Sequence, residues 1–331
     1  MKAMHFVAAA LVGLAAFTPD ARADEVKIAT LAPDGSAWAK IMTSGGKKIS
    51  ERTGGRVTAK YFFSGSQGDE RDVVRKMKLG QIDGAALTAV GLGLIKGDVR
   101  VLELPFMFKS DKELDYVRTK MAPDFEKQFD EAGYTLVAWG DVGWTHLYSN
   151  IPVATAADLN KTKMWAWTDD PIVRTFFKRL GVNGVPLGVN DVKPSLETGA
   201  IDACYGSPLV AIVFQWYTKV KFATDQPINY AIGALVIRKE VFNKLSPEDQ
   251  KTVRDTGAEM QGELLANVRR DNGRARTTME RGGIKFVPTP PELIAEFERQ
   301  GQGVWADLSG GKLYSTELLD KVKKHVADAR K

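Results

Sequence analysis

Cysteine and histidine are scarce in this chain of 331 residues, which contains one cysteine, Cys204, and three histidines. A single cysteine cannot form an internal disulfide, so the fold must be held together without such cross-links. His146 and His325 lie far apart in the sequence, and without a second cysteine they do not make a zinc-binding set. We therefore expect no metal site and no cofactor.

Long apolar runs are lacking after the first 23 residues. Residues 1–23 are typical of a cleaved secretory signal, with a positive charge at Lys2, a short apolar run over residues 6–17 and small residues at the cleavage site. The run is too short for a stable membrane anchor, and no cysteine follows it to carry a lipid. We expect a mature protein that begins near Asp24 and is exported to the periplasm.

A large excess of one charge sign is also lacking. The formal net charge is +5, and basic residues are interspersed with acidic ones. No stripe of basic and aromatic residues indicates nucleic-acid binding, so we expect no nucleic-acid partner. Ser207 has no recognisable nucleophile elbow, base or triad partner, so we expect no catalytic residue and no enzyme.

Strands alternate with helices along the first part of the chain. The pattern predicts strands over residues 26–31 and 57–63, and helices over residues 37–53 and 70–79. Such alternation predicts an α/β fold with a largely parallel sheet covered on both faces.

A long helix is predicted over residues 246–281. Ser246 is suited to the N-cap and Pro247 to the first helical position, and no helix breaker intervenes before Gly282. About 35 residues make a helix of roughly 50 Å, which is long enough to cross two lobes. A final helix is predicted over residues 316–330.

A local pattern occurs twice, in residues 78–85 (KLGQIDGA) and residues 197–204 (ETGAIDAC). Each copy reads as a helix end, a glycine suited to positive φ, a buried isoleucine, an aspartate and a strand of small residues. Since ligands in open α/β sheets lie beyond the carboxyl ends of strands, two such ends indicate a cleft between two similar lobes. The alternative is that each copy is an ordinary connection between a helix and a strand, with no role in binding.

Several further segments occur in a characteristic order. They are residues 29–36 (ATLAPDGS), 68–71 (GDER), 104–108 (LPFMF), 158–159 leading into 163–164, 180–187 (LGVNGVPL) and 245–250 (LSPEDQ). Together they resemble the DctP-type family, the periplasmic solute-binding proteins of TRAP transporters, over nearly all of the mature chain.

The resemblance implies a two-lobed periplasmic-binding-protein fold with hinge strands between the lobes. One lobe is expected over residues 24–147 with part of 232–280, and the other over residues 148–231 with part of 281–331. The helix over residues 246–281 is expected to span both. The resemblance also implies that the lobes close over a ligand, which is then delivered to the subunits of a TRAP membrane permease.

The sequence departs from the family where relatives usually hold a charged or amide group. Trp165 stands where the family keeps an arginine that grips a substrate carboxylate. Thr145 stands where a basic residue is often found, and the segment with Tyr205 and Ser207 replaces an Asn-Pro ending. If residues 163–167 form a strand, Trp165 and Trp167 share one face, where they either fill a core or wall a pocket.

These departures predict an apolar pocket with a few hydroxyl donors. A carboxylate closed into a dry cleft needs a paired cation, whereas an apolar ligand that buries about 300 Å² gains on the order of 7 kcal/mol before binding costs. We therefore expect a hydrophobic or amphipathic organic ligand, as implied for the subset of TRAP systems with a tetratricopeptide-repeat partner protein. The expected ligand-binding residues are Ser36, Trp38, Thr88, Trp144, Thr145, Trp165, Trp167, Tyr205 and Ser207.

Other interpretations stay open. The chain could bind a small carboxylate through another cation, such as Arg71, Lys163 or Arg174, or could serve as an exported ligand sensor. The pair Asp169-Asp170 before Pro171 favours a helix cap over a metal site.

Overall fold

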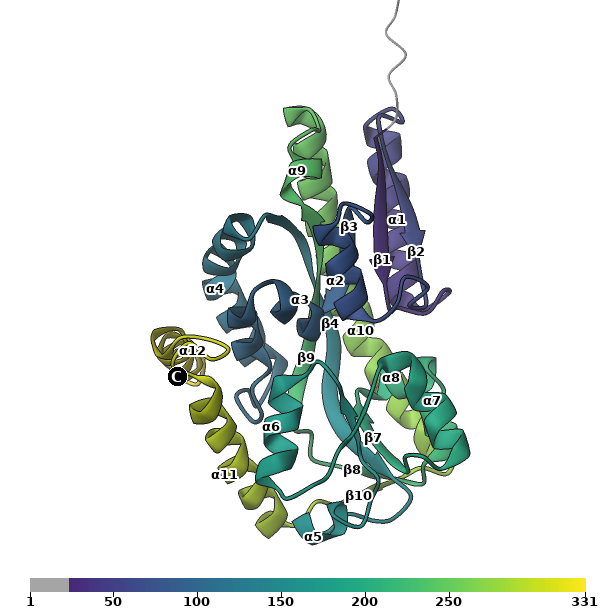
Figure 1. Cartoon of the computed structure of the whole chain (residues 1–331), viewed down its shortest axis with the longest axis vertical. Coiled ribbons are helices and arrows are strands. Elements are labelled where there is room, and N and C mark those ends of the chain that lie inside the picture. Colours follow the sequence, from purple (N-terminus) through teal and green to yellow (C-terminus); the bar gives the residue numbers. More distant parts are fainter. Residues whose placement is uncertain (1–23) are drawn as a thin grey trace, which may run out of the picture.

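The computed structural model describes residues 24–331 of the chain, so the predicted signal at residues 1–23 lies outside the described part. One lobe holds three parallel strands and the helices beside them (Figure 1). These elements are β1 (Asp24–Thr30), β2 (Val57–Phe62), β3 (Gly84–Thr88), α1 (Ala37–Arg52), α2 (Glu70–Lys78), α3 (Ala89–Ile95), the 3₁₀ helix η1 (Gly97–Glu103) and α4 (Asp111–Glu131). The predicted helices over 37–53 and 70–79 are confirmed.

The other lobe is built from shorter elements at the opposite end of the molecule (Figure 1). They are α5 (Ala156–Leu159), β5 (Trp165–Trp167), α6 (Pro171–Arg179), β6 (Val185–Leu187), α7 (Val189–Thr198), β7 (Ala203–Gly206), α8 (Pro208–Val213), the 3₁₀ helix η2 (Trp216–Lys219), β8 (Phe222–Thr224) and β10 (Lys285–Val287). The short run with two tryptophans is therefore a strand over residues 165–167, which meets the condition under which Trp165 and Trp167 share one face.

The main sheet has eight strands in the order β10-β8-β4-β9-β3-β1-β2, with β7 also paired to β4. The expectation of a largely parallel sheet was wrong, because the strands of the hinge run antiparallel to their neighbours. β9 (Asn229–Arg238) pairs antiparallel with both β3 and β4, and β4 pairs antiparallel with β7 and β8. Strands that carry the chain directly from one lobe to the other need no crossover helix, and this favours antiparallel pairing.

Strand β4 (Tyr134–Ser149) joins the lobes. Its residues up to Thr145 pair with β9, and its last four residues pair with β7. A bulge interrupts the register between Asp141 and Gly143. Gly143 has φ +120°, and a Cβ there would lie 2.5 Å from the amide nitrogen of Asn272, so this position requires glycine. β4 and β9 are the hinge strands that the sequence predicted.

The long helix α10 (Pro247–Arg281) has 35 residues, as predicted. Ser246 caps it by accepting a hydrogen bond from the Asp249 amide at 3.1 Å. The helix packs against α1 of one lobe, α8 of the other and β4 between them. It therefore spans both lobes and packs along the hinge strand β4.

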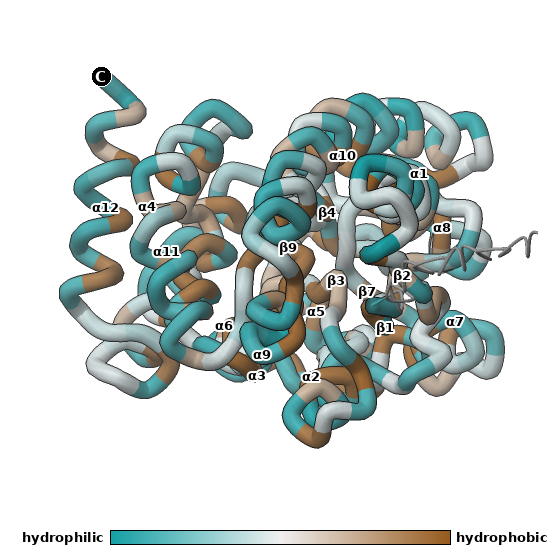
Figure 2. The backbone as a smooth tube through the Cα atoms, turned by 90° about the horizontal axis from the view of Figure 1, so that it is seen from above, coloured by the Kyte–Doolittle hydropathy of each residue, from teal (hydrophilic) through white to brown (hydrophobic). Residues whose placement is uncertain are grey.

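Three further helices complete the fold: α9 (Lys239–Phe242), α11 (Pro291–Leu308) and α12 (Thr316–Ala329). Seen from above, hydrophobic and hydrophilic stretches alternate along α4, α11 and α12 (Figure 2). The apolar face of α12, which includes Leu319 and Val322, is buried, and the helix packs on α4. Within residues 24–331, every helix is too short or too polar to cross a bilayer.

Candidate functional site

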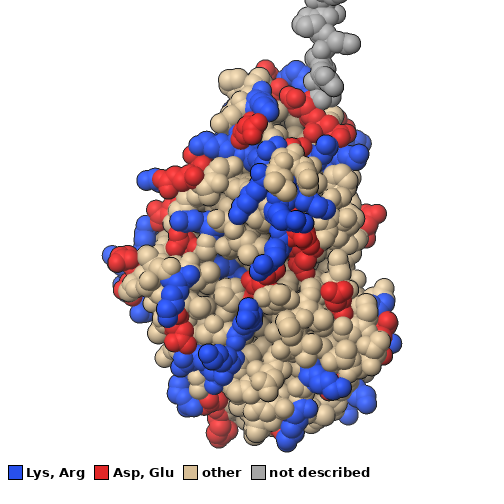
Figure 3. Space-filling model, in the orientation of Figure 1, with Lys and Arg blue, Asp and Glu red and all other residues tan. Residues whose placement is uncertain are grey.

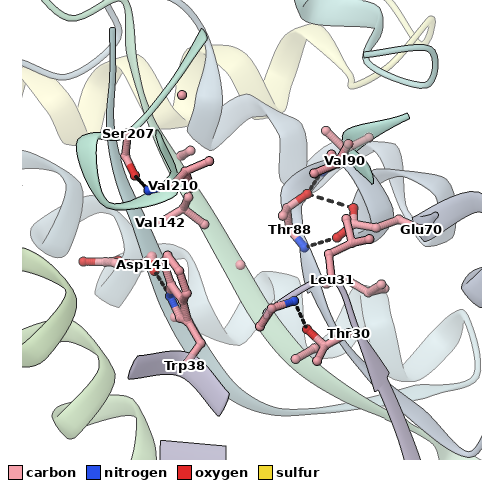
Figure 4. Close-up of a pocket in the computed structure, with 18 of the residues that line it drawn as sticks. Thr30, Leu31, Trp38, Glu70, Thr88, Val90, Asp141, Val142, Ser207 and Val210 are labelled. Atoms are coloured by element: carbon pink, nitrogen blue, oxygen red, sulfur yellow. Dashed lines mark hydrogen bonds between the residues drawn. The ribbon is translucent and has the colours of Figure 1, made fainter. Parts of the chain in front are cut away.

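A cavity of about 200 Å³ lies between the lobes. Its lining comes from the ends of β1, β3, β5 and β7, from the hinge strands β4 and β9, and from α10. Figure 4 shows Thr88 and Glu70 facing one side of this space, and Ser207, Val210 and Trp38 on the other. The sheet therefore places the carboxyl ends of strands from both lobes around one space.

Aromatic rings form the second-lobe wall of the cavity. Trp165 stacks on Tyr205 with ring centroids 4.6 Å apart and lies 6.1 Å from the Trp167 ring, and Trp216 meets it edge to face at 5.3 Å. The Trp165 indole N–H donates to the Leu187 carbonyl at 3.0 Å, and the Tyr205 hydroxyl oxygen accepts from the Trp167 amide at 3.2 Å. Trp165 is only 2% exposed, so it both belongs to the core and lines the cavity.

The repeated sequence pattern builds an equivalent corner in each lobe. Gly80 and Gly199 both have φ near +70°, at +72° and +71°. In the first lobe Asp83 accepts a bond from the Lys27 amide at 3.0 Å, and in the second lobe Asp202 accepts one from the Lys163 amide at 2.7 Å. The pattern is therefore a true structural repeat.

Each repeat leads through a strand to a hydroxyl that caps a helix beside the cavity. Thr88 caps α3 by accepting a bond from the Val90 amide at 3.2 Å, and Ser207 caps α8 by accepting one from the Val210 amide at 3.3 Å (Figure 4). Both residues line the cavity. The two lobes thus present their helix N-termini to the same space.

Glu70 is a buried acid in the first-lobe wall. Its carboxylate accepts bonds from the Thr88 amide (2.6 Å), the Thr88 hydroxyl (2.8 Å) and the Gly91 amide (2.6 Å). No Lys or Arg in residues 24–331 forms an ion pair with it. Burial raises the pKa of Glu70 to about 8, although the three donors oppose this shift.

A second buried acid, Glu103, shares a cation with Asp170. The Arg100 guanidinium lies 3.2 Å from Glu103 and 2.8 Å from Asp170, and Arg100 is 1% exposed. Asp170 also caps α6 by accepting from the Ile172 amide at 2.9 Å, which confirms the predicted helix cap. Burial raises the pKa of Glu103 to about 7, while the positive charge of Arg100 opposes the shift.

The hinge contributes a fourth acid, Asp141, whose negative charge is paired with two arginines. Its carboxylate accepts from Arg118 at 2.7 Å, Arg269 at 2.9 Å and the Tyr230 hydroxyl at 2.6 Å. Its backbone carbonyl accepts from the Trp38 indole N–H at 3.0 Å (Figure 4). Trp38, at the start of α1, is thereby held against the hinge, and it lines the cavity.

No Lys, Arg or His belongs to the part of the cavity lining that lies within residues 24–331. None of the three cations named as possible carboxylate partners lines the cavity. Lys163 is exposed and donates to the Gly199 carbonyl at 2.7 Å, and Arg71 is exposed and pairs with Asp169. Arg174 is exposed on α6. On the face shown in Figure 3, basic and acidic residues are interspersed. Nor does any group of three or more His, Cys, Asp and Glu in this part of the chain suit a metal ion.

The structure brings seven of the nine expected residues to the cavity: Trp38, Thr88, Thr145, Trp165, Trp167, Tyr205 and Ser207. It places the other two elsewhere. Ser36 caps α1 by accepting from the Ala39 amide at 3.3 Å. Trp144 faces the opposite side of β4 from its neighbour Thr145, as strand alternation requires. Its indole N–H donates to Asp111 at 2.8 Å. On that side of the strand Trp144 and His146 line a separate hollow.

Other lining residues were not anticipated. Trp216, Glu70, Met260 and Leu264 also line the cavity. Met260 and Leu264 lie four residues apart on α10, so their spacing on one helix face was a usable signal. Glu70 carried no such signal, because an acid in the first turn of a helix is ordinary.

The comparisons with known proteins agree on a family. The model of the bacterial extracellular solute-binding proteins, family 7 (DctP), matches residues 28–310. A solute-binding protein of Roseobacter denitrificans is 28% identical over 286 residues, 84% of this chain and 85% of its own length. Its structure with bound L-galactonate superposes with a TM-score of 0.82 and covers 91% of this chain and 98% of that one, at 23% identity.

Two other solved structures share the fold. A TRAP periplasmic solute-binding protein of Ralstonia eutropha, with bound (S)-2-hydroxy-2-methyl-3-oxobutanoate, has a TM-score of 0.86 at 21% identity, over 92% of this chain and 99% of that one. A Bordetella pertussis extracytoplasmic solute receptor that binds pyroglutamic acid has a TM-score of 0.84 at 21% identity, over 93% and 99% of the two chains.

Proposed function

The chain belongs to family 7 of the bacterial extracellular solute-binding proteins, the DctP family of TRAP transporters, and on that premise we propose that its ligand is hydrophobic or amphipathic. The family consists of periplasmic binding receptors, not enzymes. The proposed mechanism is closure of two lobes over the ligand, followed by its delivery to the membrane permease. One lobe comprises residues 24–147 with part of 232–280, and the other residues 148–231 with part of 281–331.

The observation that carries the proposal is the absence of a basic side chain from the described cavity lining. The lining contains Glu70, Glu103, Asp141 and Asp170 but no basic side chain within the described residues, and its remaining surface is mostly aromatic and aliphatic. A ligand carboxylate enclosed here would lose its hydration and gain no paired cation, which costs several kcal/mol. An uncharged apolar ligand gains from burial against the rings and meets no such cost.

The relatives bind acids, as the bound galactonate, oxobutanoate and pyroglutamic acid of the solved structures show for those proteins. In this chain Trp165 occupies the place where the family resemblance puts a carboxylate-gripping arginine. Its indole N–H is used within its own lobe, on the Leu187 carbonyl. The proposal is therefore that this chain keeps the family fold and carries a different class of ligand.

Mass spectrometry of the ligand retained on native purification from the periplasm tests the proposal. We expect an uncharged or amphipathic molecule small enough for a cavity of about 200 Å³. Calorimetry with a matched pair, 3-phenylpropan-1-ol and 3-phenylpropanoate, should show binding of the alcohol at least about tenfold tighter, because only the acid brings an unpaired charge. Recovery of a small dicarboxylate alone, or tighter binding of the acid, would contradict the proposal.

Trp165→Arg should reverse the preference of the cavity. A guanidinium at this position removes the stacked ring and adds the missing cation, so alcohol binding should be lost while the acid gains. Trp165→Phe is the control, because it keeps an aromatic ring without adding charge.

A partner protein with tetratricopeptide repeats remains a prediction from the resemblance, and a role as an exported ligand sensor remains an alternative. A pull-down from the native periplasm addresses both.

A further inference from the structure

Asp69 joins the two lobes at the rim of the cavity. It lies at the N-terminus of α2 in the first lobe, and one carboxylate oxygen accepts from the Glu70 amide at 2.6 Å. Its other oxygen accepts two bonds from the second lobe: one from the Val189 amide at 3.0 Å and one from the Trp167 indole N–H at 3.2 Å. One carboxylate therefore serves both lobes at once.

The second lobe depends on this carboxylate for a helix cap. The N-cap residue of α7 is Gly188, which has no side chain to accept a bond from the first turn. The Val189 amide, at the first helical position, has no acceptor within its own helix and is satisfied by Asp69 of the other lobe. Three of the N-caps around the cavity, Thr88, Asp170 and Ser207, accept bonds from their own helices, so α7 differs from them.

The space for Asp69 is also made by Gly188. A Cβ at Gly188 would lie 2.6 Å from the Asp69 carboxylate oxygen, closer than real Cβ contacts come. The backbone there, at φ −73°, suits any residue, so the close approach and not the conformation favours glycine. Beside it, Arg71 of the first lobe pairs with Asp169 of the second.

We infer that Asp69 is the residue that couples ligand binding to lobe closure, because it caps α7 and fixes the Trp167 ring only when the lobes are together. Trp167 provides the link to the ligand, since its ring lines the cavity while its N–H reaches Asp69. When the lobes separate, α7 loses its cap and Trp167 its partner. The inference rests on the proposed closure of the lobes over a ligand.

The variant Asp69→Asn isolates the contact between the lobes. Asparagine caps α2 as well as aspartate does, but its amide N–H₂ would face two donors, Val189 N–H and the Trp167 indole. Amide hydrogen exchange at Val189 reports closure directly, because Asp69 is its only acceptor among the described residues. We expect exchange at Val189 to rise about tenfold or more, and 3-phenylpropan-1-ol to dissociate correspondingly faster.

Two more variants keep the test independent of any one substitution. Gly188→Ala obstructs the Asp69 carboxylate without altering a donor or acceptor, and Trp167→Phe removes one of the two donors. Both should raise Val189 exchange. Trp144→Phe is the matched control, because the indole N–H it removes donates to Asp111 away from the cavity, so Val189 exchange should stay at the wild-type level.

The outcomes separate the inference from the proposed function. Wild-type exchange at Val189 and a wild-type dissociation rate in Asp69→Asn and Gly188→Ala would overturn the inference. Small-angle scattering of the wild type with 3-phenylpropan-1-ol tests closure itself: if the protein does not become more compact, the proposed closure fails, and the inference fails with it. A compacting wild type together with unaffected variants would leave the proposed function standing and remove only the role of Asp69.

Discussion

The two walls of the cavity are built on the same repeated pattern but carry different side chains. In each lobe a glycine at positive φ follows a helix, an aspartate accepts a hydrogen bond from the backbone amide of a neighbouring segment, and a hydroxyl caps the next helix. Beyond that pattern the first-lobe wall carries Glu70 under Thr88, whereas the second-lobe wall carries the stacked rings of Trp165 and Tyr205.

The difference lies in segments outside the repeat. Glu70 comes from the start of α2, and Trp165 from β5, which pairs only with β6 and not with the main sheet. The repeat therefore gives both lobes an equivalent corner, and the neighbouring segments supply the side chains that differ between the walls.

The largest effect is expected where the walls meet, at Arg100. This guanidinium neutralises Glu103 of its own lobe and Asp170 of the other, and all three are buried. Arg100→Met would leave two carboxylates buried without a cation, so we expect the free energy of unfolding to fall by about 3–5 kcal/mol. Denaturant titration measures this loss.

A double variant serves as the control for Arg100. In Arg100→Met/Glu103→Gln the Gln oxygen can still accept from the Ile232 amide, which bonds to Glu103 at 2.8 Å. Removal of one of the two uncompensated charges should restore a substantial part of the lost stability. Equal losses in the single and double variants would show that lost packing, and not charge, explains the effect.

The second-largest effect is expected at Glu70, the buried acid that forms no ion pair with another described residue. The pKa of Glu70 is raised from its ordinary 4.5 to about 8 by burial, so the folded state holds a proton that the unfolded state has released between these values. This contribution to stability is complete below pH 4.5 and is lost as the pH rises toward 8. Glu70→Gln cannot titrate at this position, so its unfolding free energy should fall less steeply with pH than that of the wild type. The two slopes should differ by up to about 1.4 kcal/mol per pH unit.

Unfolding titrations between pH 5 and 8 check this slope. Some slope should remain in Glu70→Gln, because the pKa of Glu103 is also raised by burial, to about 7. Identical slopes in the wild type and the variant would mean that the three donors from Thr88 and Gly91 keep Glu70 ionised throughout this range.

A smaller effect compares the two hydroxyl caps directly. Ser207→Ala removes the cap of α8 and should cost about 1 kcal/mol. Thr88→Ala removes the cap of α3 and also the 2.8 Å bond from its hydroxyl to Glu70, so we expect a loss of about 2 kcal/mol. Thermal unfolding of both variants gives the difference; equal losses would mean that the Thr88–Glu70 bond adds no net stability.

The sequence allowed the fold to be predicted wherever a local signal existed. The caps at Ser246 and Asp170 and the glycines of the repeat are local chemistry, and each lies where it was expected. Strand direction was predicted wrongly, because pairing between β4 and β9 joins segments about a hundred residues apart. No local pattern encodes that register.

The candidate site shows the same limit. Thr145 and Trp144 are neighbours in the sequence, yet Thr145 lines the cavity and Trp144 a separate hollow on the opposite side of β4. The register of β4 against β9 shifts between Leu136 and Ala138 and again between Asp141 and Gly143, so simple alternation along the strand does not show which side faces the cavity. The partnership of Glu70 with Thr88 and that of Arg100 with Asp170 are likewise tertiary contacts. Residue type indicated an apolar pocket, but the positions of its acids needed the structure.

The smallest effect is expected at Thr145, which belongs to the hinge and to neither wall. Its hydroxyl lines the cavity and makes no hydrogen bond to another residue of the described chain, so it is available to a ligand. Thr145→Val keeps the shape, and we expect little change in stability and a loss of about 2–10-fold in affinity for 3-phenylpropan-1-ol. Calorimetry with ethylbenzene, which has no hydroxyl, is the control and should show no loss. If the variant binds both probes as the wild type does, polar recognition of the ligand rests on the walls alone and the hinge only joins them.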